Sequence, residues 1–269
     1  MAGSSSLTEL AKRPEPIYPK NPSYGSGAFR RRITFSYDGM IADLTVYDDF
    51  HDMHVCMTVS DNVVSAIDAS MRRYPKTTCP GAVASLSALV GAEVSAKGTS
   101  HLALNAGEQC THLLQLAALG LTSLARGSTS FTAEIVVYDL DEEDRQTVTI
   151  ELDGQQVFKI RLHDNVIVEP IVFNGRRLFG GFGKWVAASF EGMEADLWRM
   201  AQISVFVATG RKWIVDGTVQ RRVGEEPSRE GVCHSYSRPA FPDALAMVNY
   251  VRDHSDGLPP LEDSGPKSR

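Results

Sequence analysis

The sequence predicts an α+β fold in which antiparallel strands are followed by paired helices, with this order occurring twice. Short segments in both halves alternate apolar and polar residues, as half-buried strands do. Two Asp-Gly pairs are typical of hairpin turns, and apolar residues at helical spacing follow each set of strands. With 269 residues, of which 43% are hydrophobic, the chain is long enough for one large domain or two small ones.

The first predicted unit spans residues 30–126 and places its strands before its helices. Segment 63–73 fits either a strand or a helix, and we favour a strand because β-branched residues open it and Pro75 follows it. Asp38-Gly39 is the hairpin turn signal of this unit. The expected strands are residues 32–37, 40–47, 53–60 and 63–73, and the expected helices are about 79–91 and 109–126.

The second predicted unit spans residues 127–222 and repeats that order. Asp153-Gly154 is its hairpin turn signal, and Pro170 interrupts its last extended segment. The repeated order suggests a duplicated arrangement in which the two helical pairs face one another. The alternative is a single α+β domain in which this order arises by chance, because residue identity between the halves is low. The expected strands are 132–138, 147–152, 156–162 and 166–173, and the expected helices are about 178–190 and 192–210.

The two ends of the chain are polar and rich in proline. Residues 1–29 are expected to form an extended arm that is ordered only where it packs on the body or on a partner subunit, so a homodimer is left open. Residues 223–269 are expected to form a polar tail with one short helix over 242–254 and disorder from residue 255.

Composition excludes several classes of protein. The net charge of −6 argues against nucleic-acid binding, and the run Arg30-Arg31-Arg32 is expected to be a solvated strand entrance. The sequence has no stretch of about 18 apolar residues, so we expect no membrane-spanning helix. The first 20 residues lack the apolar core of a signal peptide. Four cysteines without a CxxC pair predict reduced thiols and a cytoplasmic protein.

The best candidate site combines a strand end with a helix start. Asp49 and His51 lie in a short acidic and histidine-rich segment after a predicted strand, and His112 follows Cys110 at the start of a predicted helix. Because positions i and i+2 of a helix diverge by about 200°, Cys110 and His112 do not face each other. We expect His112 to act with His51 or Asp49, and Asp49 to orient His51 as a general base. The alternatives are a buried structural histidine and carboxylates that serve only as turn residues.

The cysteines are weaker candidates. Cys79 begins a helix with Pro80, where a thiolate or an anion would be favoured, but a free cysteine is more often a small buried apolar residue. A zinc site from Cys79, Cys110 and His112 is less expected, because structural zinc usually takes closely spaced cysteine pairs. We therefore expect no metal and no cofactor.

Aromatic residues concentrate in the second half, where core packing accounts for most of them. An aromatic-lined pocket needs only two or three, and the candidates are Phe182, Trp185 and Trp198. Glu194 interrupts an apolar helix face beside Trp198 and is either a solvated charge or a pocket carboxylate.

Five motifs together resemble a bacterial family known as a domain of unknown function. They are Asp48-Asp49-Phe50-His51, Arg73-Tyr74-Pro75, Cys79-Pro80-Gly81-Ala82, Leu89-Val90-Gly91 and Cys110-Thr111-His112-Leu113, and the resemblance spans about residues 30–210. Some relatives act on lignin-derived aromatic dimers, and one is a phenylcoumaran γ-formaldehyde lyase. The resemblance therefore implies an enzyme that cleaves a carbon–carbon bond and releases formaldehyde from a small aromatic substrate. His51 and His112 would share proton transfer in a mostly apolar pocket between the two halves, and Tyr47 would hydrogen-bond a phenol of the substrate.

Two other function classes remain open. One is a non-catalytic protein that binds hydrophobic ligands in the same pocket. The other is a Cys/His metal or iron–sulfur scaffold, since the chain also resembles, more faintly, the iron–sulfur scaffold fold. That scaffold has a third cysteine late in its domain, whereas Cys233 lies far beyond that point in the polar tail.

Overall fold

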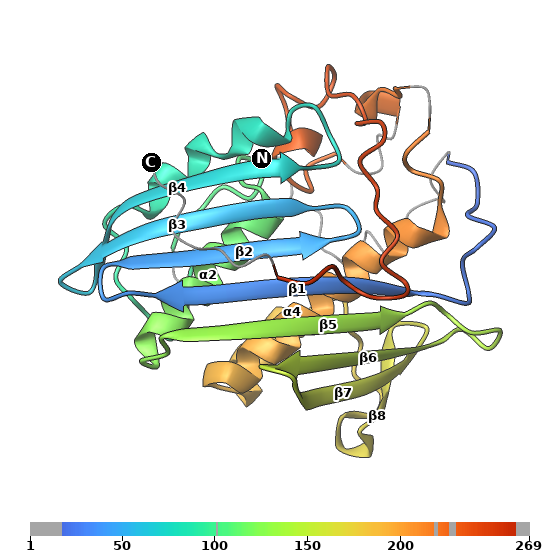
Figure 1. The fold of residues 1–269 in the computed structure, drawn as a ribbon, viewed down its shortest axis with the longest axis horizontal. Coiled ribbons are helices and arrows are strands. Elements are labelled where there is room, and N and C mark those ends of the chain that lie inside the picture. Colours follow the sequence, from blue (N-terminus) through green and yellow to red (C-terminus); the bar gives the residue numbers. More distant parts are fainter. Residues whose placement is uncertain (1–17, 101, 218–219, 226–229, 262–269) are drawn as a thin grey trace.

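The chain folds around one sheet of eight antiparallel strands with helices on one face (Figure 1). The computed structural model describes residues 18–261 except 101, 218–219 and 226–229. The order across the sheet is β4-β3-β2-β1-β5-β6-β7-β8, which confirms the expected α+β class. The strands are β1 (Ala28–Tyr37), β2 (Ile41–Asp48), β3 (Asp52–Ser60), β4 (Val63–Arg73), β5 (Ser130–Tyr138), β6 (Arg145–Leu152), β7 (Gln155–His163) and β8 (Val166–Glu169).

The first strands of the two predicted units lie side by side. β1 pairs with β5 from Ala28 to Ser36, with Ile33 opposite Ala133, so each unit contributes four strands to one continuous sheet. From this central pair, the strands of each unit follow outward in chain order as simple antiparallel neighbours. This arrangement places the helix after β4 and the helices after β8 over adjacent parts of the same face.

Two long helices cover that face of the sheet. The helix α2 (Thr111–Ala125) packs on β2 and β3, α4 (Gly192–Ala208) packs on β5 and β6, and the two helices also contact each other (Figure 1). Alternate residues of β2 point toward α2, and Ala42, Leu44 and Val46 are accordingly buried. The core therefore lies between the sheet and the helices.

Gly120 allows α2 to approach the sheet closely. A Cβ atom at this position would lie 2.2 Å from Cε of Met57 and 2.9 Å from Cδ1 of Leu44, both of which are fully buried. Glycine lowers helix stability in general, but here its missing side chain leaves room for two core residues.

The expected helix over 79–91 is instead two short 3-10 helices, Cys79–Ala82 and Ala84–Leu89. Backbone hydrogen bonds in this segment span three residues, as between the N–H of Leu86 and the carbonyl of Val83. The N–H of Gly91 donates to the carbonyl of Val64 on β4, which stops the segment from continuing as an α-helix.

Several other boundaries differ from expectation in the second half. The helix expected over 178–190 is α3 (Phe182–Ser189), and it begins late because Gly180 and Gly181 have positive φ angles of 84° and 74°. After β8 the chain turns at Pro170 into a 3-10 helix, Ile171–Phe173, rather than continuing as a strand.

The C-terminal segment corrects two expectations. No helix forms over residues 242–254, because Leu245 and Ala246 make isolated β-bridges with Arg222 and Lys76. Residues 255–261 pack against β1, where Arg30 Nε donates to the carbonyl of Ser255 at 3.2 Å and Arg32 Nη1 to that of Pro259 at 2.7 Å. This segment crosses the face of the sheet opposite the helices (Figure 1). Residues 262–269, also expected to be disordered, lie outside the described part.

The N-terminal arm is described only from residue 18 onward, and residues 1–17 lie outside the described part. Lys20 forms a β-bridge with Trp213, and the N–H of Ile214 donates to the carbonyl of Pro19. The described end of the arm therefore packs on the body and leads directly into β1, which begins at Ala28. Within the described residues, no helix has the length and apolarity needed to cross a bilayer.

Candidate functional site

The turn between β2 and β3 holds a buried carboxylate. Asp48 Oδ1 accepts the backbone N–H groups of Phe50 at 2.7 Å and His51 at 2.8 Å, which closes the turn. The side chain of His51 folds back so that its Nδ1 lies 3.0 Å from Oδ1 of Asp48. Arg31 lies opposite Asp48 in the register of β1 and β2, and it donates to Oδ2 through Nε at 2.8 Å and Nη2 at 2.6 Å.

Asp48 is ionised in this setting. Burial by itself would raise its pKa, but the charges of His51 and Arg31 and the hydrogen bond from His51 hold the pKa well below its usual range. An ionised carboxylate only accepts hydrogen bonds, so Nδ1 of His51 carries the proton in this pair. The remaining nitrogen of a neutral His51, Nε2, then has a free lone pair.

His112 stacks against His51. The ring centroids are 3.9 Å apart and the ring planes differ by 31°. Helix α2 brings His112 here from its first turn, directly after the N-cap residue Cys110. Burial, together with the charges of His51 and Arg31, holds the pKa of His112 well below its usual value, so this ring is neutral at neutral pH. Its Nε2 is buried and has no hydrogen-bond partner among the described residues.

The structure brings His51 and His112 together, but it places Asp48, and not Asp49, beside His51. Asp49 points to a different cluster, where its Oδ2 accepts from Arg211 Nη1 at 2.9 Å. Arg211 also pairs with Asp139 and Asp253, each at 3.0 Å. Burial raises the pKa of Asp49 to about 7, and the charges of Asp48 and Asp253 add to this rise, whereas the hydrogen bond and the charge of Arg211 oppose it. The Asp49–Arg211 cluster ties the β2–β3 turn to the C-terminal segment.

Arg31, like Asp48, belongs to this site although sequence reasoning did not select it. The basic run was expected to be solvated, but Arg31 is 0% exposed, and its Nη1 is buried without a partner among the described residues. Strand alternation was the available signal, because Phe29, Arg31 and Ile33 occupy the same face of β1 as the core. A charged residue on the core face indicates a buried partner, which is Asp48.

Tyr47 lies away from the histidine pair. It neighbours Asp48 on β2, so its side chain points to the opposite face of the sheet. There the guanidinium of Arg73 lies 4.9 Å from the ring centroid of Tyr47, and the ring of His254 lies 5.3 Å away. Arg73 also donates to the backbone carbonyls of Asp48 and His51, so it stabilises the β2–β3 turn from the face of the sheet that carries Tyr47.

The aromatic candidates form a packed cluster in the second half. Ring centroids are 5.1 Å apart for Phe182 and Trp185, and 5.3 Å apart for Trp185 and Trp198. Phe182 and Trp198 are almost completely buried, which favours the core-packing interpretation. Glu194 is exposed in the first turn of α4, as expected of a solvated charge near a helix N-terminus.

The structure brings three cysteines to one region. The backbone N–H of His234, next to Cys233, donates to the carbonyl of Gln109, next to Cys110. Ser235 Oγ lies 3.4 Å from Cys79 Sγ. Burial raises the pKa of Cys110 to about 12 and that of Cys233 to about 11, so these thiols are protonated at neutral pH. Among the described residues, no group of three or more His, Cys, Asp or Glu side chains is arranged to hold a metal ion.

A cavity of about 350 Å³ lies between α2 and α4. Its wall is mostly apolar, and Gln115 is part of it. Gln115 lies three residues after His112 and therefore on a neighbouring position of the same helix face. The cavity thus joins the two halves of the chain and comes within one helical turn of the histidine pair.

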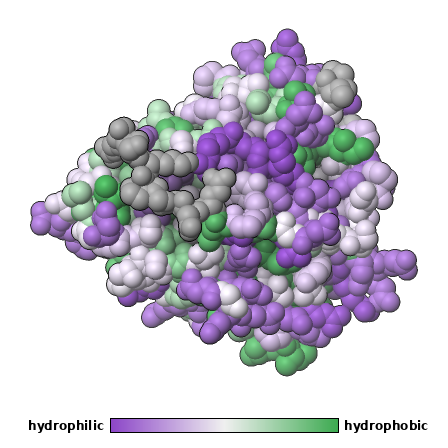
Figure 2. Space-filling model, viewed as in Figure 1, coloured by the Kyte–Doolittle hydropathy of each residue, from purple (hydrophilic) through white to green (hydrophobic). Residues whose placement is uncertain are grey.

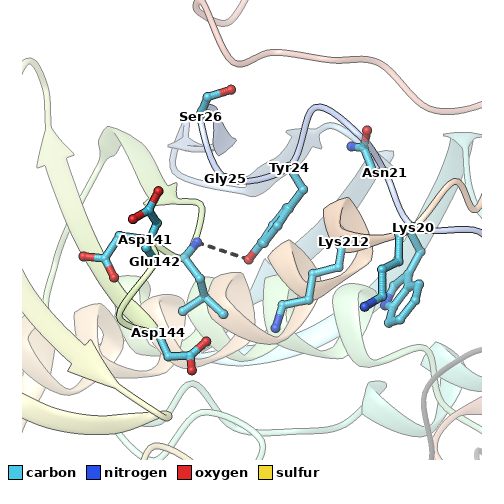
Figure 3. Close-up of a pocket in the computed structure, with 11 residues that line it drawn as sticks. Lys20, Asn21, Tyr24, Gly25, Ser26, Asp141, Glu142, Asp144 and Lys212 are labelled. Carbon is cyan, nitrogen blue, oxygen red and sulfur yellow. Dashed lines mark hydrogen bonds between the residues drawn. The ribbon is translucent and has the colours of Figure 1, made fainter.

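A second, larger cleft of about 630 Å³ lies where the N-terminal segment meets the β5–β6 connection (Figure 3). Figure 3 shows Asp141, Glu142 and Asp144 on one side of Tyr24, and the side chains of Lys20 and Lys212 on the other. Tyr24 lies in the middle of the cleft, where its hydroxyl oxygen accepts a hydrogen bond from the N–H of Leu140 at 3.2 Å. The cleft is polar and open, unlike the cavity between the helices.

Residues 32–124 match the model of a family described as protein of unknown function (DUF2889). The matched segment runs from β1 to α2 and contains Asp48, His51 and His112, but it leaves out the second half. It is shorter than the region of resemblance expected from the motifs, about residues 30–210. No curated protein matches the chain.

Proposed function

We propose that the protein is an enzyme that uses general acid–base chemistry at His51 and His112. The observation that carries this proposal is the buried Asp48–His51 pair stacked on a neutral His112 whose Nε2 has no partner among the described residues. A carboxylate on one ring nitrogen fixes the tautomer and stabilises the imidazolium that forms when the other nitrogen accepts a proton. A structural histidine needs no such pair and leaves no buried nitrogen unpaired.

The two histidines have different roles in this proposal. His51 is the base, because Asp48 compensates the charge that it gains. His112 is neutral at rest, so it receives the proton that His51 takes from the substrate hydroxyl, and its low pKa favours release of that proton to the leaving oxygen. Arg31 keeps Asp48 ionised and does not take part in proton transfer.

We further propose that the substrate is a lignin-derived aromatic dimer, such as a phenylcoumaran, with a primary alcohol side chain. The base removes the hydroxyl proton, and the bond between the alcohol carbon and its neighbour breaks to release formaldehyde. The electron pair of that bond forms a double bond to the benzylic carbon, whose bond to oxygen breaks. That oxygen then takes up a proton, so the reaction needs no oxidant or reductant. The reaction type rests on the motif resemblance, and the histidine pair supports its acid–base part.

Formaldehyde release from a panel of phenylcoumaran alcohols tests the proposal. We expect His51→Gln and His112→Gln each to lower turnover about 100-fold or more, the scale for losing a general acid or base. His54→Gln is the matched control, because His54 pairs with Asp43 on a partly exposed site of β3. If both site variants keep full turnover, the histidine pair is not catalytic. If no phenylcoumaran releases formaldehyde, the substrate assignment is wrong.

One observation favours a second candidate, a non-catalytic protein that binds apolar ligands. The cavity between α2 and α4 has the apolar lining that such a function needs, and it requires no titrating group. Ligand binding that is unchanged in His51→Gln and His112→Gln, without turnover of any panel compound, would favour this candidate.

A further inference from the structure

The cavity between α2 and α4 has an apolar wall and a polar rim. The wall combines residues of both helices, and its volume of about 350 Å³ is at the lower end of the range for small-molecule sites. A ligand of this size has one ring and a short side chain. The apolar wall residues are Leu114, Ala118, Leu119, Met200 and Ile203.

The rim of the cavity has a surplus of positive charge. Among the described residues that line it, Asp196 is the only acidic one. Its Oδ2 accepts from Thr122 Oγ1 and from Arg126 Nη1, each at 2.7 Å, and its Oδ1 accepts from Arg199 Nη1 at 3.1 Å. Arg126 lies outside the lining and already balances the charge of Asp196. Arg199 and Lys97, which both line the cavity, therefore leave a net positive charge.

The wall also contains an unsatisfied donor. Gln115 Nε2 is buried and has no hydrogen-bond partner among the described residues. Leaving a buried donor unpaired is unfavourable, and an acceptor atom on a ligand would recover that lost free energy. The amide of Gln202, by contrast, is used within the fold, since its Nε2 donates to the carbonyl of Leu178 at 2.8 Å.

We infer that this cavity binds a small carboxylate with an apolar, ring-sized body. Arg199 and Lys97 attract the carboxylate, Gln115 Nε2 donates to one of its oxygens, and the apolar wall holds the body. A neutral ligand would leave the positive rim uncompensated, and a cation would be repelled. The inference goes beyond the proposed function, because a cavity that holds a single ring is a binding site separate from the one that an aromatic dimer would need at the histidine pair.

Isothermal titration with 3-phenylpropanoate and with its neutral analogue 3-phenylpropanol tests the inference without any turnover. We expect the wild-type protein to bind the acid at least about tenfold more tightly than the alcohol, because hydrogen bonds between charged groups contribute more than neutral ones. Arg199→Gln and Gln115→Leu should each weaken binding of the acid by about tenfold while leaving that of the alcohol nearly unchanged.

Two further variants control for folding and location. Ala118→Phe fills the cavity and should abolish binding of both compounds, whereas Lys159→Gln removes an exposed cation on β7 and should change nothing. A thermal melt of each variant checks that it is folded. Equal binding of acid and alcohol, or undiminished binding by a folded Arg199→Gln protein, would overturn the inference. Formaldehyde release without binding of the acid would overturn the inference and leave the proposed function intact. Binding of the acid without formaldehyde release would support the inference and overturn the proposed function.

Discussion

At the residue scale, the β2–β3 turn depends on one fully buried carboxylate, that of Asp48. Its carboxylate and the guanidinium of Arg31 are both 0% exposed, so each depends on the other for compensation. Removing one partner of a buried pair is far more costly than removing an exposed one, because the remaining charge has no solvent. The same carboxylate orients His51, so stability and the proposed chemistry depend on a single side chain.

Asp48→Asn should therefore lower the free energy of unfolding by about 3–5 kcal/mol, since Arg31 is left as an unpaired buried cation. Urea denaturation measures this loss, and Asp43→Asn, which breaks a half-exposed pair with His54, should cost less than about 1 kcal/mol. If Asp48→Asn does not fold, the double variant Arg31→Met with Asp48→Leu should recover stability without activity. Equal effects of Asp48→Asn and Asp43→Asn would contradict the burial argument.

The raised pKa of Asp49 makes the free energy of unfolding depend on pH. Its pKa is about 7 in the folded protein, well above the ordinary value near 3.9 of an unfolded chain. The folded state therefore binds the proton more tightly, and the stability that this contributes is present below about pH 4 and is lost as pH rises to about 7.

The free energy of unfolding of the wild type, relative to Asp49→Asn, should thus fall by about 1.4 kcal/mol per pH unit between about pH 4 and pH 7. Asparagine cannot titrate, so the variant lacks this slope. Urea denaturation at a series of pH values measures the difference. A difference that is constant with pH would mean that Asp49 is ionised and simply paired with Arg211.

At the scale of elements, the close packing of α2 on the sheet sets the position of His112. Leu44 and Met57 fill the space that Gly120 leaves open, so the helix lies near β2 and β3. That proximity brings the first turn of α2 to the β2–β3 turn, where His112 meets His51. A displaced helix would separate the two rings.

Gly120→Ala and Gly183→Ala form a matched pair that tests this packing. Both glycines lie in helices, where alanine is intrinsically favoured by about 1 kcal/mol. A Cβ atom at Gly183 meets nothing within 4 Å, so this variant should be as stable as the wild type or more stable. Gly120→Ala should be less stable than Gly183→Ala by about 1–3 kcal/mol, because two buried side chains must shift. Equal melting temperatures would show that the core accommodates the added methyl group at position 120 without losing stability.

At the scale of the whole molecule, the C-terminal segment closes the face of the sheet opposite the helices. It crosses β1 and β2 in Figure 1, on a surface that is mostly hydrophilic with small apolar patches in Figure 2. Polar groups anchor it: Arg211 pairs with Asp253, and Arg32 donates to the carbonyl of Pro259. The ring of Tyr250 packs 6.4 Å from that of Phe50, next to His51 in the β2–β3 turn.

Truncation after residue 248 should therefore lower the melting temperature and expose the β2–β3 turn, since it removes Tyr250, Asp253 and the contacts to β1. Truncation after residue 261 leaves all of those contacts in place and should have little effect. Thermal melts and hydrogen exchange of the backbone N–H groups of Phe50 and His51 measure the two consequences. Equal melting temperatures and equal protection in both truncated proteins would show that the segment does not stabilise the turn.

The sequence by itself determined the elements whose signals are local. Alternation of apolar residues located the strands, including β4 over residues 63–73, and helical spacing located α2 and α4. The short 3-10 helices after β4 and the bridges near Leu245 were missed, because their backbone hydrogen bonds depend on distant partners or on a three-residue spacing that apolar patterning does not distinguish.

Only the tertiary structure decided which chemical groups meet. His51 and His112 were chosen from sequence, but Asp48, Arg31 and the region shared by Cys79, Cys110 and Cys233 were not. The turn geometry selects Asp48 over Asp49, and strand pairing places Arg31 opposite it. Sequence periodicity reports which face of an element is buried, whereas the partner across the core follows from sheet register and helix packing, which are long-range properties of the fold.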